Sequence, residues 1–209
     1  MRKIAELTDR RILWIAMIVI ALLLEQTAYQ VFQKWLFMKP CEQCVYIRFS
    51  MFCLIIAGVI GAVLPGNGAV KIAASIIAIY GAVKGIGFSL ALYRIHTAML
   101  SDNPFGVQGC SYTPAFPFHL PLHRWFPATF LPTGDCGIDY PVVPSGAALG
   151  PVQKYFVDLY KDGWFLIPGK RFMTMEQAML LCFATFLAAL LVCLVSWVVV
   201  GVRKRRRPA

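Results

Sequence analysis

The sequence predicts an all-α membrane protein, a four-transmembrane-helix bundle with a long, irregular, disulfide-containing loop on its outer side. Of the 209 residues, 59% are hydrophobic and only 14% are charged, and the mean hydropathy is +0.67. Ordinary soluble domains are less apolar. Four apolar stretches are each long enough to supply the ~20 residues that a helix needs to cross a bilayer core. They cover residues 12–32, 45–64, 70–93 and 178–202, so the whole chain, 1–209, is expected to form one integral membrane domain.

Basic residues predict that both termini lie in the cytoplasm, because Lys and Arg in short segments beside the spans mark that side. They lie before the first stretch, after the last stretch and in the short connection between the second and third stretches: Arg2, Lys3, Arg10, Arg11, 203–207 and Lys71. The loops 33–44 and 94–177 then face outward, into the periplasm of a bacterium. A cleaved signal peptide is the competing interpretation of the first stretch, but no A-x-A-like site follows it and three more spans do.

The net charge of +10 does not indicate nucleic-acid binding. The positive charge is concentrated at the ends of the chain that flank the membrane, and the loop 94–177 carries six acidic and six basic residues. Anchoring and topology therefore explain the excess better than a polyanionic partner.

Cys41 and Cys44 form a C-x-x-C pair where the first outer loop meets the second apolar stretch. Such a bridge closes a very small loop, so it is a weak staple and a good redox couple. The partial positive charge of a helix N-terminus favours a thiolate there. Arg48 follows one turn later, where it could stabilise a thiolate at Cys44 or negative charge on an acceptor. The alternative is an arginine that snorkels to lipid headgroups.

The other cysteines divide by environment. Cys110 and Cys136 also lie on the outer side, and four cysteines in an oxidising compartment favour disulfides, either redox-active or purely structural. A zinc site is disfavoured because 25 residues separate the second pair, so we expect no metal. The three remaining cysteines fall within apolar spans, where a thiol usually behaves as a small hydrophobe: Cys53, Cys182 and Cys193.

The long outer loop holds ten of the thirteen prolines and is expected to be irregular. Its segment 120–126 mixes aromatic, aliphatic and basic residues as interfacial segments do. Further on, Val152, Tyr155, Phe156 and Leu159 recur with helical spacing and predict a short amphipathic helix. That helix either lies flat on lipid or packs on the outer ends of the spans.

Some residues within the spans are also informative. Glu25 is costly in lipid, so it is either a functional candidate or a structural partner of Lys84. Small residues spaced four apart let helices approach closely: Gly81 with Gly85, and Ala57 with Gly61.

Three segments together resemble the DsbB family of quinone-linked disulfide oxidoreductases. They are KPCEQCVYIR at 39–48, FGVQGC at 105–110, and the stretch from FHLPL at 118–122 to PTGDC at 132–136. The Cys-Glu-Gln-Cys centre and the lengthened region after Cys136 look most like the DsbI branch of that family. The resemblance covers nearly the whole chain, with four helices and both cysteine pairs in order.

This resemblance implies a quinone-dependent protein-disulfide oxidoreductase of the bacterial inner membrane, with a periplasmic active site. A periplasmic thioredoxin-like dithiol protein, DsbL-like or DsbA-like, would attack Cys110, and Cys136 would pass the electrons to Cys41. Cys44 would face a membrane quinone, either ubiquinone or menaquinone. The resemblance also implies that His96 lies near the quinone, although His96 could equally be an ordinary interfacial residue. Arg48, one turn from Cys44, is the other expected quinone-binding residue.

Two features depart from the better-known family pattern. Glu42 replaces an apolar residue between the thiols, and its negative charge should oppose thiolate formation. The extension 137–177 has no residue-level explanation. Two other functions remain open: a reductase-direction thiol protein resembling vitamin K epoxide reductases, where the C-x-x-C is expected near the last helix, and a non-catalytic scaffold with two structural disulfides.

Overall fold

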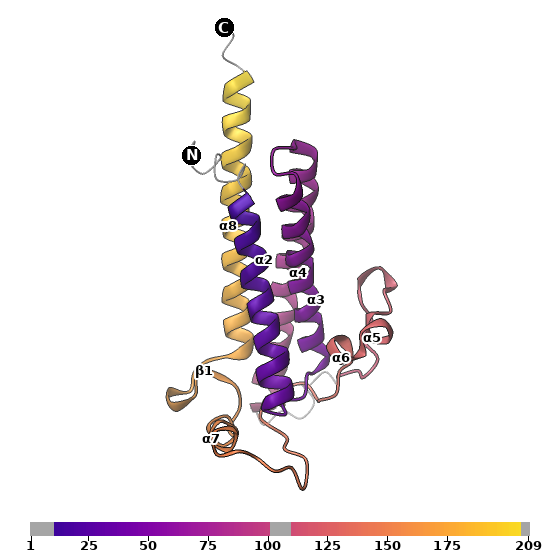
Figure 1. The fold of residues 1–209 in the computed structure, drawn as a ribbon, viewed down its shortest axis with the longest axis vertical. Coiled ribbons are helices and arrows are strands. Elements are labelled where there is room, and N and C mark those ends of the chain that lie inside the picture. Colours follow the sequence, from indigo (N-terminus) through magenta and orange to yellow (C-terminus); the bar gives the residue numbers. More distant parts are fainter. Residues whose placement is uncertain (1–10, 101–109, 206–209) are drawn as a thin grey trace. The chain divides into compact units, whose positions relative to one another are not determined.

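The computed structural model describes residues 11–100 and 110–205 (Figure 1). Some features used in the sequence analysis lie outside these ranges. They are the basic residues Arg2, Lys3 and Arg10, the segment 105–109 before Cys110, and the end of the basic tail, 206–207.

Four long helical segments dominate the described chain. They are α2 (Arg11–Gln26) continued by the π-helix η1 (Thr27–Trp35), α3 (Glu42–Val63), α4 (Gly68–Leu100) and α8 (Met175–Arg205). All four are long and apolar enough to cross a membrane, by length and composition. The predicted fold class, an all-α membrane protein with four such helices and a cysteine-containing loop, is confirmed.

The helix ends differ from the predicted span ends. The third helix continues to Leu100 where the apolar stretch ends at residue 93, because the hydrophobic pattern marks the part that suits lipid and not the end of the hydrogen-bonded helix. Asn67 caps the start of α4, since its Oδ1 accepts hydrogen bonds from the N–H groups of Ala69 and Val70 at 2.9 and 3.3 Å.

The chain forms two compact units, and each long helix contributes to both. The first unit comprises Met1–Leu23, Ser50–Lys84 and Cys182–Ala209. Within its described part, the predicted small residues allow close packing. The ring of Trp14 lies against the backbone of Gly61, and a Cβ on Gly81 would stand 2.7 Å from Cβ of Cys53. Lys71 is buried, with Nζ 4.9 Å from the ring centre of Trp197.

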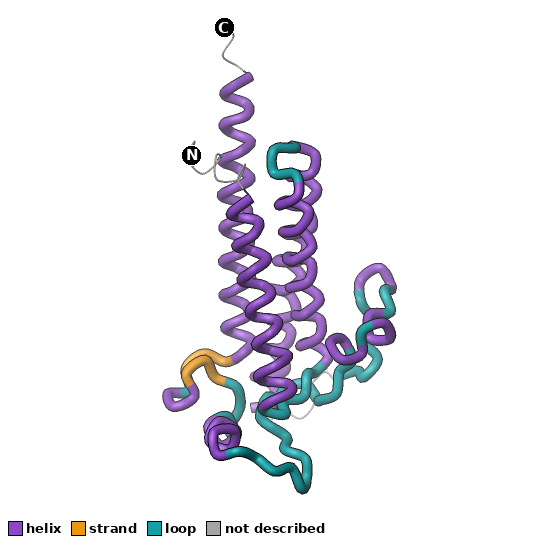
Figure 2. Tube along the Cα trace, in the orientation of Figure 1, coloured by secondary structure: helices purple, strands orange, loops and turns teal. Residues whose placement is uncertain are grey.

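The second unit, Leu24–Phe49 with Gly85–Leu181, contains both cysteine pairs. Its short elements are η2 (Pro117–His119), α5 (Leu122–Trp125), α6 (Pro127–Phe130), α7 (Pro151–Leu159), β1 (Phe165–Ile167), η3 (Pro168–Lys170) and β2 (Phe172–Thr174) (Figure 2). The strands form an antiparallel hairpin in which Phe165 pairs with Thr174 and Ile167 with Phe172. The sequence analysis expected an irregular loop with one short helix and did not predict this hairpin, although Pro168-Gly169 between two short apolar runs is a turn signal.

The predicted amphipathic helix is confirmed as α7, and the structure shows what its apolar face contacts. The ring of Phe156 lies 5.5 Å from that of Trp35, and Nε2 of Gln153 donates to the Trp35 carbonyl at 2.6 Å. Val152 and Tyr155 stay exposed. Part of the apolar face therefore packs on the end of the first long helix, which is the second of the two arrangements expected for it.

Candidate active site

The Cys41–Cys44 disulfide lies at the N-terminus of α3, as predicted. Cys41 immediately precedes the helix and is buried, and Cys44 is half-buried in the first turn. The backbone N–H of Cys44 donates to Sγ of Cys41 at 3.2 Å, so the sulfur occupies the position of an N-cap acceptor. The helix terminus therefore directs its partial positive charge toward this cysteine pair.

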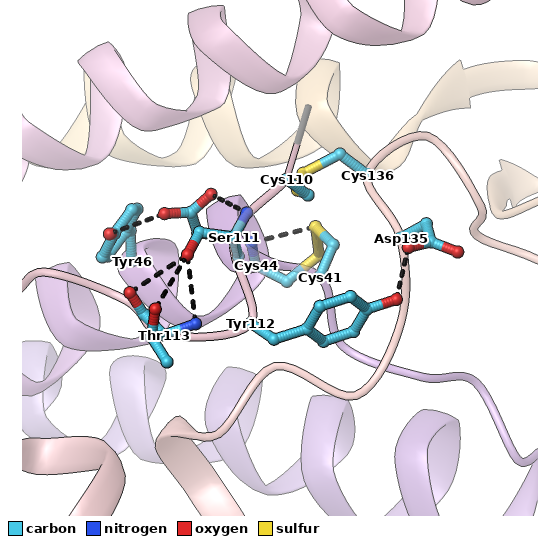
Figure 3. Close-up of a disulfide and its surroundings, with 10 residues drawn as sticks. Cys41, Cys44, Tyr46, Cys110, Ser111, Tyr112, Thr113, Asp135 and Cys136 are labelled. Atoms are coloured by element: carbon cyan, nitrogen blue, oxygen red, sulfur yellow. Dashed lines mark hydrogen bonds between the residues drawn. A yellow bond between two sulfur atoms is a disulfide. The ribbon is translucent and has the colours of Figure 1, made fainter. Parts of the chain in front are cut away.

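Cys110 and Cys136 form the second disulfide, with their Cα atoms 5.6 Å apart (Figure 3). This is the pairing that the family resemblance implies. The remaining three cysteines are free and lie within the long helices, as expected of small hydrophobes: Cys53, Cys182 and Cys193.

Main-chain hydrogen bonds attach the Cys136 arm, residues 133–136, to the segment before Cys41. The N–H groups of Thr133 and Gly134 both donate to the carbonyl of Pro40, at 2.9 and 3.1 Å. Gly134 is required there, because a Cβ would stand 2.8 Å from the carbonyl oxygen of Lys39. Cys136 is thus held close to Cys41 in space although 94 residues separate them in sequence.

The Cys110 arm, residues 110–115, contacts the first pair through a side chain that the sequence analysis treated only as an unfavourable charge. Oε2 of Glu42 accepts the N–H of Ser111 at 2.8 Å, and Oε1 accepts the hydroxyl of Tyr46 at 2.9 Å. The Tyr46 oxygen in turn accepts the N–H of Ala115 at 2.9 Å. The signal that could have indicated this role is an acidic residue between two cysteines at a helix start, where it can accept hydrogen bonds from a facing loop.

Arg48 is buried one turn beyond Cys44, and its partners are protein groups. Nη1 donates to Oε1 of Gln33 at 2.7 Å and to the carbonyl of Thr129 at 3.1 Å. Nε lies 3.5 Å from Oε1 of Glu25, so Glu25 is paired with Arg48. These contacts differ from those of an arginine that reaches out to headgroups.

His96, on α4, lies beside the first cysteine pair. Its Nδ1 is 3.0 Å from Oε1 of Glu176, a buried residue in the first turn of α8. Both residues line a small hollow together with Cys41, Cys44 and Asp139. The hollow has a volume of about 10 Å³, which is room for about one water molecule. Sequence reasoning missed Glu176 and Asp139, because neither belongs to a recognisable motif.

Asp139 connects the loop after Cys136 to the hairpin. Its Oδ2 accepts the N–H of Trp164 at 3.1 Å, and Gly163 beside it has a φ of +113° that favours glycine. Burial raises the pKa of Asp139, against the lowering effects of the Trp164 hydrogen bond and of nearby His96. Trp164 also packs edge-on against Phe32, with ring centres 5.6 Å apart.

Comparison with known proteins finds one matching family and several similar proteins. The family model for the disulfide bond formation protein DsbB matches residues 10–195. The protein-disulfide oxidoreductase DsbI of Salmonella typhimurium is 48% identical over 194 residues, covering 90% of this chain and 86% of its own. The DsbI protein of Escherichia coli O6:K15:H31 is 45% identical over 194 residues, covering 90% and 87%. A DsbI-named relative in Campylobacter fetus is 46% identical over 196 residues, covering 94% and 91%.

Proposed function

Because this chain belongs to the DsbB family and is a protein-disulfide oxidoreductase, we propose that it reoxidises a periplasmic dithiol protein and passes the electrons to a membrane quinone. The observation that carries the proposal is the attachment of one disulfide to the other. Backbone groups beside Cys136 bond to Pro40, next to Cys41, and the backbone beside Cys110 bonds to Glu42. A scaffold stapled by two independent bridges needs no such connection.

The relay consists of two thiol–disulfide exchanges within the protein. A thiolate of the donor attacks Cys110, forms a mixed disulfide and releases Cys136. Cys136 then attacks Cys41, so that the Cys41–Cys136 bond forms, the Cys41–Cys44 bond breaks and Cys44 leaves as a thiolate. When the donor's second thiol resolves the mixed disulfide and Cys110 resolves the Cys41–Cys136 bond, the donor is oxidised and Cys41 and Cys44 are left as a dithiol.

The donor set around α3 fits a quinone as the final acceptor. Arg48 is a buried cation one turn from Cys44, and Oε1 of Glu25 beside it is buried without a hydrogen-bond partner in the described chain. A quinone carbonyl accepts hydrogen bonds and a quinol hydroxyl donates them, so these two side chains suit both forms. A bound quinone would accept two electrons and two protons from the dithiol. His96 lies beside the cysteines on another helix, next to a hollow the size of one water molecule.

The proposed donor is a thioredoxin-like oxidase of the DsbL or DsbA type. A strongly oxidising protein of that kind has a reduction potential of about −120 mV, so only an acceptor of comparable or higher potential can reoxidise it. A lipid quinone kept oxidised by respiration, ubiquinone or menaquinone, meets that requirement.

We place the protein in the bacterial inner membrane with both termini in the cytoplasm and both cysteine pairs in the periplasm. The charge distribution supports this orientation. The cysteine pair lies at the N-terminus of α3, whereas Lys71 lies in the first turn of α4 and the basic residues 203–205 end α8.

Anaerobic mixing of the purified protein with a reduced thioredoxin-like donor and a soluble quinone tests the proposal, with quinone absorbance as the readout. We expect one quinone reduced for each donor oxidised, and thiol trapping during turnover should capture both pairs in changing oxidation states. A structural scaffold, by contrast, would retain both disulfides while donor and quinone stayed unchanged.

A further inference from the structure

We propose that Glu42 is a positioning residue that holds the Cys110 arm against the first cysteine pair during exchange between the two pairs. The inference rests on the proposed function, because it assigns a role within that relay. We call the group formed by Glu42, Tyr46, Ser111 and Ala115 the Glu42 clasp.

Both oxygens of the Glu42 carboxylate are engaged, and by different parts of the chain. Oε1 faces Tyr46, four residues along the same helix, while Oε2 accepts the N–H of Ser111, which is 69 residues away. Tyr46 adds a second attachment to the same arm, since its oxygen accepts the N–H of Ala115. The arm is therefore bonded to α3 at Ser111 and Ala115, on either side of the bend at residues 112–113.

The ring of Tyr46 is itself fixed. It stacks on Phe88 with ring centres 5.0 Å apart and meets Phe116 edge-on at 5.4 Å. A fixed phenol directs its hydroxyl toward Glu42 with little loss of side-chain freedom, which favours the hydrogen bond. The clasp is thus supported by aromatic packing on one side and by the first turn of α3 on the other.

The two cysteine arms are attached in different ways, and this difference gives Glu42 its role. The Cys136 arm is held by main-chain bonds to Pro40, which no substitution at residue 42 removes. The Cys110 arm depends on a side chain. During turnover the Cys110–Cys136 disulfide opens, and the covalent connection between the arms is lost. The clasp then keeps the donor-loaded arm beside the first pair while Cys136 attacks Cys41.

A surface hydrogen bond passes this restraint to Cys136. The hydroxyl of Tyr112 donates to Oδ1 of Asp135 at 2.5 Å, and these residues lie next to Ser111 and next to Cys136, respectively (Figure 3).

The clasp also explains how a carboxylate is tolerated between two redox cysteines. The N–H of Ser111 and the hydroxyl of Tyr46 stabilise its charge, and an acidic residue is favourable in the first turn of a helix.

The test measures the effective concentration of one inter-pair bond in the full-length protein. In the background Cys44→Ser/Cys136→Ser, Cys41 and Cys110 are left to form a bond that joins the Cys110 arm directly to the first pair. Equilibration with reduced and oxidised glutathione, followed by alkylation in denaturant, gives the effective concentration of that bond. The free cysteines of the long helices are alkylated equally in all variants.

Glu42→Ala in this background should lower the effective concentration about three- to tenfold, the factor that one surface hydrogen bond of ordinary strength supplies. Glu42→Gln keeps one acceptor oxygen and should restore part of the loss. Tyr46→Phe keeps the aromatic contacts, loses both hydroxyl bonds and should lower the value in the same direction. Gln43→Ala is the matched control, because the buried Oε1 of Gln43 has no hydrogen-bond partner in the described chain.

Equal values within twofold for Glu42→Ala, Tyr46→Phe and Gln43→Ala would overturn the proposal. If Glu42→Ala does not fold, the Tyr46→Phe result alone decides, since that variant retains its packing. The measurement uses neither donor nor quinone. If the variants lower the effective concentration as expected but the protein reduces no quinone, only the proposed function is refuted. If the protein reduces quinone but the variants leave the effective concentration unchanged, only the role of the Glu42 clasp is refuted.

Discussion

Oε1 of Glu176, at the start of α8, lies 3.0 Å from Nδ1 of His96 on α4, directly beside the Cys41–Cys44 disulfide. The carboxylate is buried and the imidazole is half-buried. An imidazole held in this way has its orientation and its tautomer fixed by the carboxylate. The contact also joins the last long helix to the third at the level of the redox centre.

Removal of this contact should destabilise the fold, and the effects of substituting Glu176 and His96 should depend on each other. We expect Glu176→Ala to lower the free energy of unfolding by about 1–2 kcal/mol, because it leaves a half-buried imidazole without its partner. In a double-mutant cycle with His96→Ala, the two effects should fall short of additivity by at least about 0.5 kcal/mol. Unfolding of the purified protein in mixed micelles measures both values, and strictly additive effects would show that the contact contributes nothing.

Arg48 and Glu25 should behave as a buried ion pair. Arg48→Ala leaves the Glu25 carboxylate uncompensated, so we expect a loss of about 3 kcal/mol in the free energy of unfolding. Arg48→Ala should also raise the KM for quinone. The double variant Arg48→Ala/Glu25→Gln should regain part of the lost stability, but its KM for quinone should stay as high as that of Arg48→Ala. If the double variant is as unstable as Arg48→Ala, the hydrogen bonds to Gln33 and Thr129 dominate instead of the charge pair.

Substitutions of Cys41, Cys44 and Cys110 should separate attack by the donor from quinone reduction. Cys41→Ser and Cys44→Ser should abolish quinone reduction, and Cys110→Ser should in addition prevent the mixed disulfide with the donor, since Cys110 is the residue attacked. Gel analysis of trapped complexes and quinone absorbance check the two steps independently. Full quinone reduction by Cys110→Ser would remove Cys110 from the relay.

Local pattern was sufficient to predict the four helices, the position of Cys41 and Cys44 at a helix start and the existence of α7. Each of these depends on residues close together in sequence, such as an apolar run or a helical repeat. The cysteine pairing and the overall activity were expected from resemblance to a family, and the comparisons agree with that family.

Contacts between distant segments could not be predicted in the same way. Glu25 was given two alternative roles, and only the packed structure shows that Arg48 is its partner. Glu42 was interpreted by its charge alone, because an acidic residue at a helix start can accept hydrogen bonds but the sequence does not identify the N–H of Ser111 as the donor. Glu176 has no local signal, since a single acidic residue at the start of an apolar helix is common and favourable on its own.

Asp139 should make the stability of the outer segment depend on pH. Burial raises its pKa above the ordinary value near 3.8, so folding disfavours its ionised form. The stability contribution of the neutral carboxyl is fully present below pH 3.8 and is lost as the pH rises through the pKa of the folded state. Asp139→Asn does not titrate, so its stability relative to wild type should improve between pH 4 and pH 7. An unchanged difference across that range would mean that the carboxylate is adequately solvated or paired by His96.

The two neighbouring aromatic residues of α7 should respond differently to truncation, because the helix packs one of them and exposes the other. Phe156 contacts Trp35 and is half-buried, whereas Tyr155 is 64% exposed. We expect Phe156→Ala to lower the free energy of unfolding by about 1–2 kcal/mol, less than the ~3–5 kcal/mol of a fully buried phenylalanine. Tyr155→Ala should change the free energy of unfolding by less than about 0.5 kcal/mol.

Limited proteolysis within residues 140–165 gives a second readout of the same difference. Loss of the Phe156 contact should expose this segment to cleavage, whereas Tyr155→Ala should leave it protected. Equal destabilisation by the two variants would indicate that α7 is oriented with both rings against other groups, which contradicts the contact with the end of the first long helix described above.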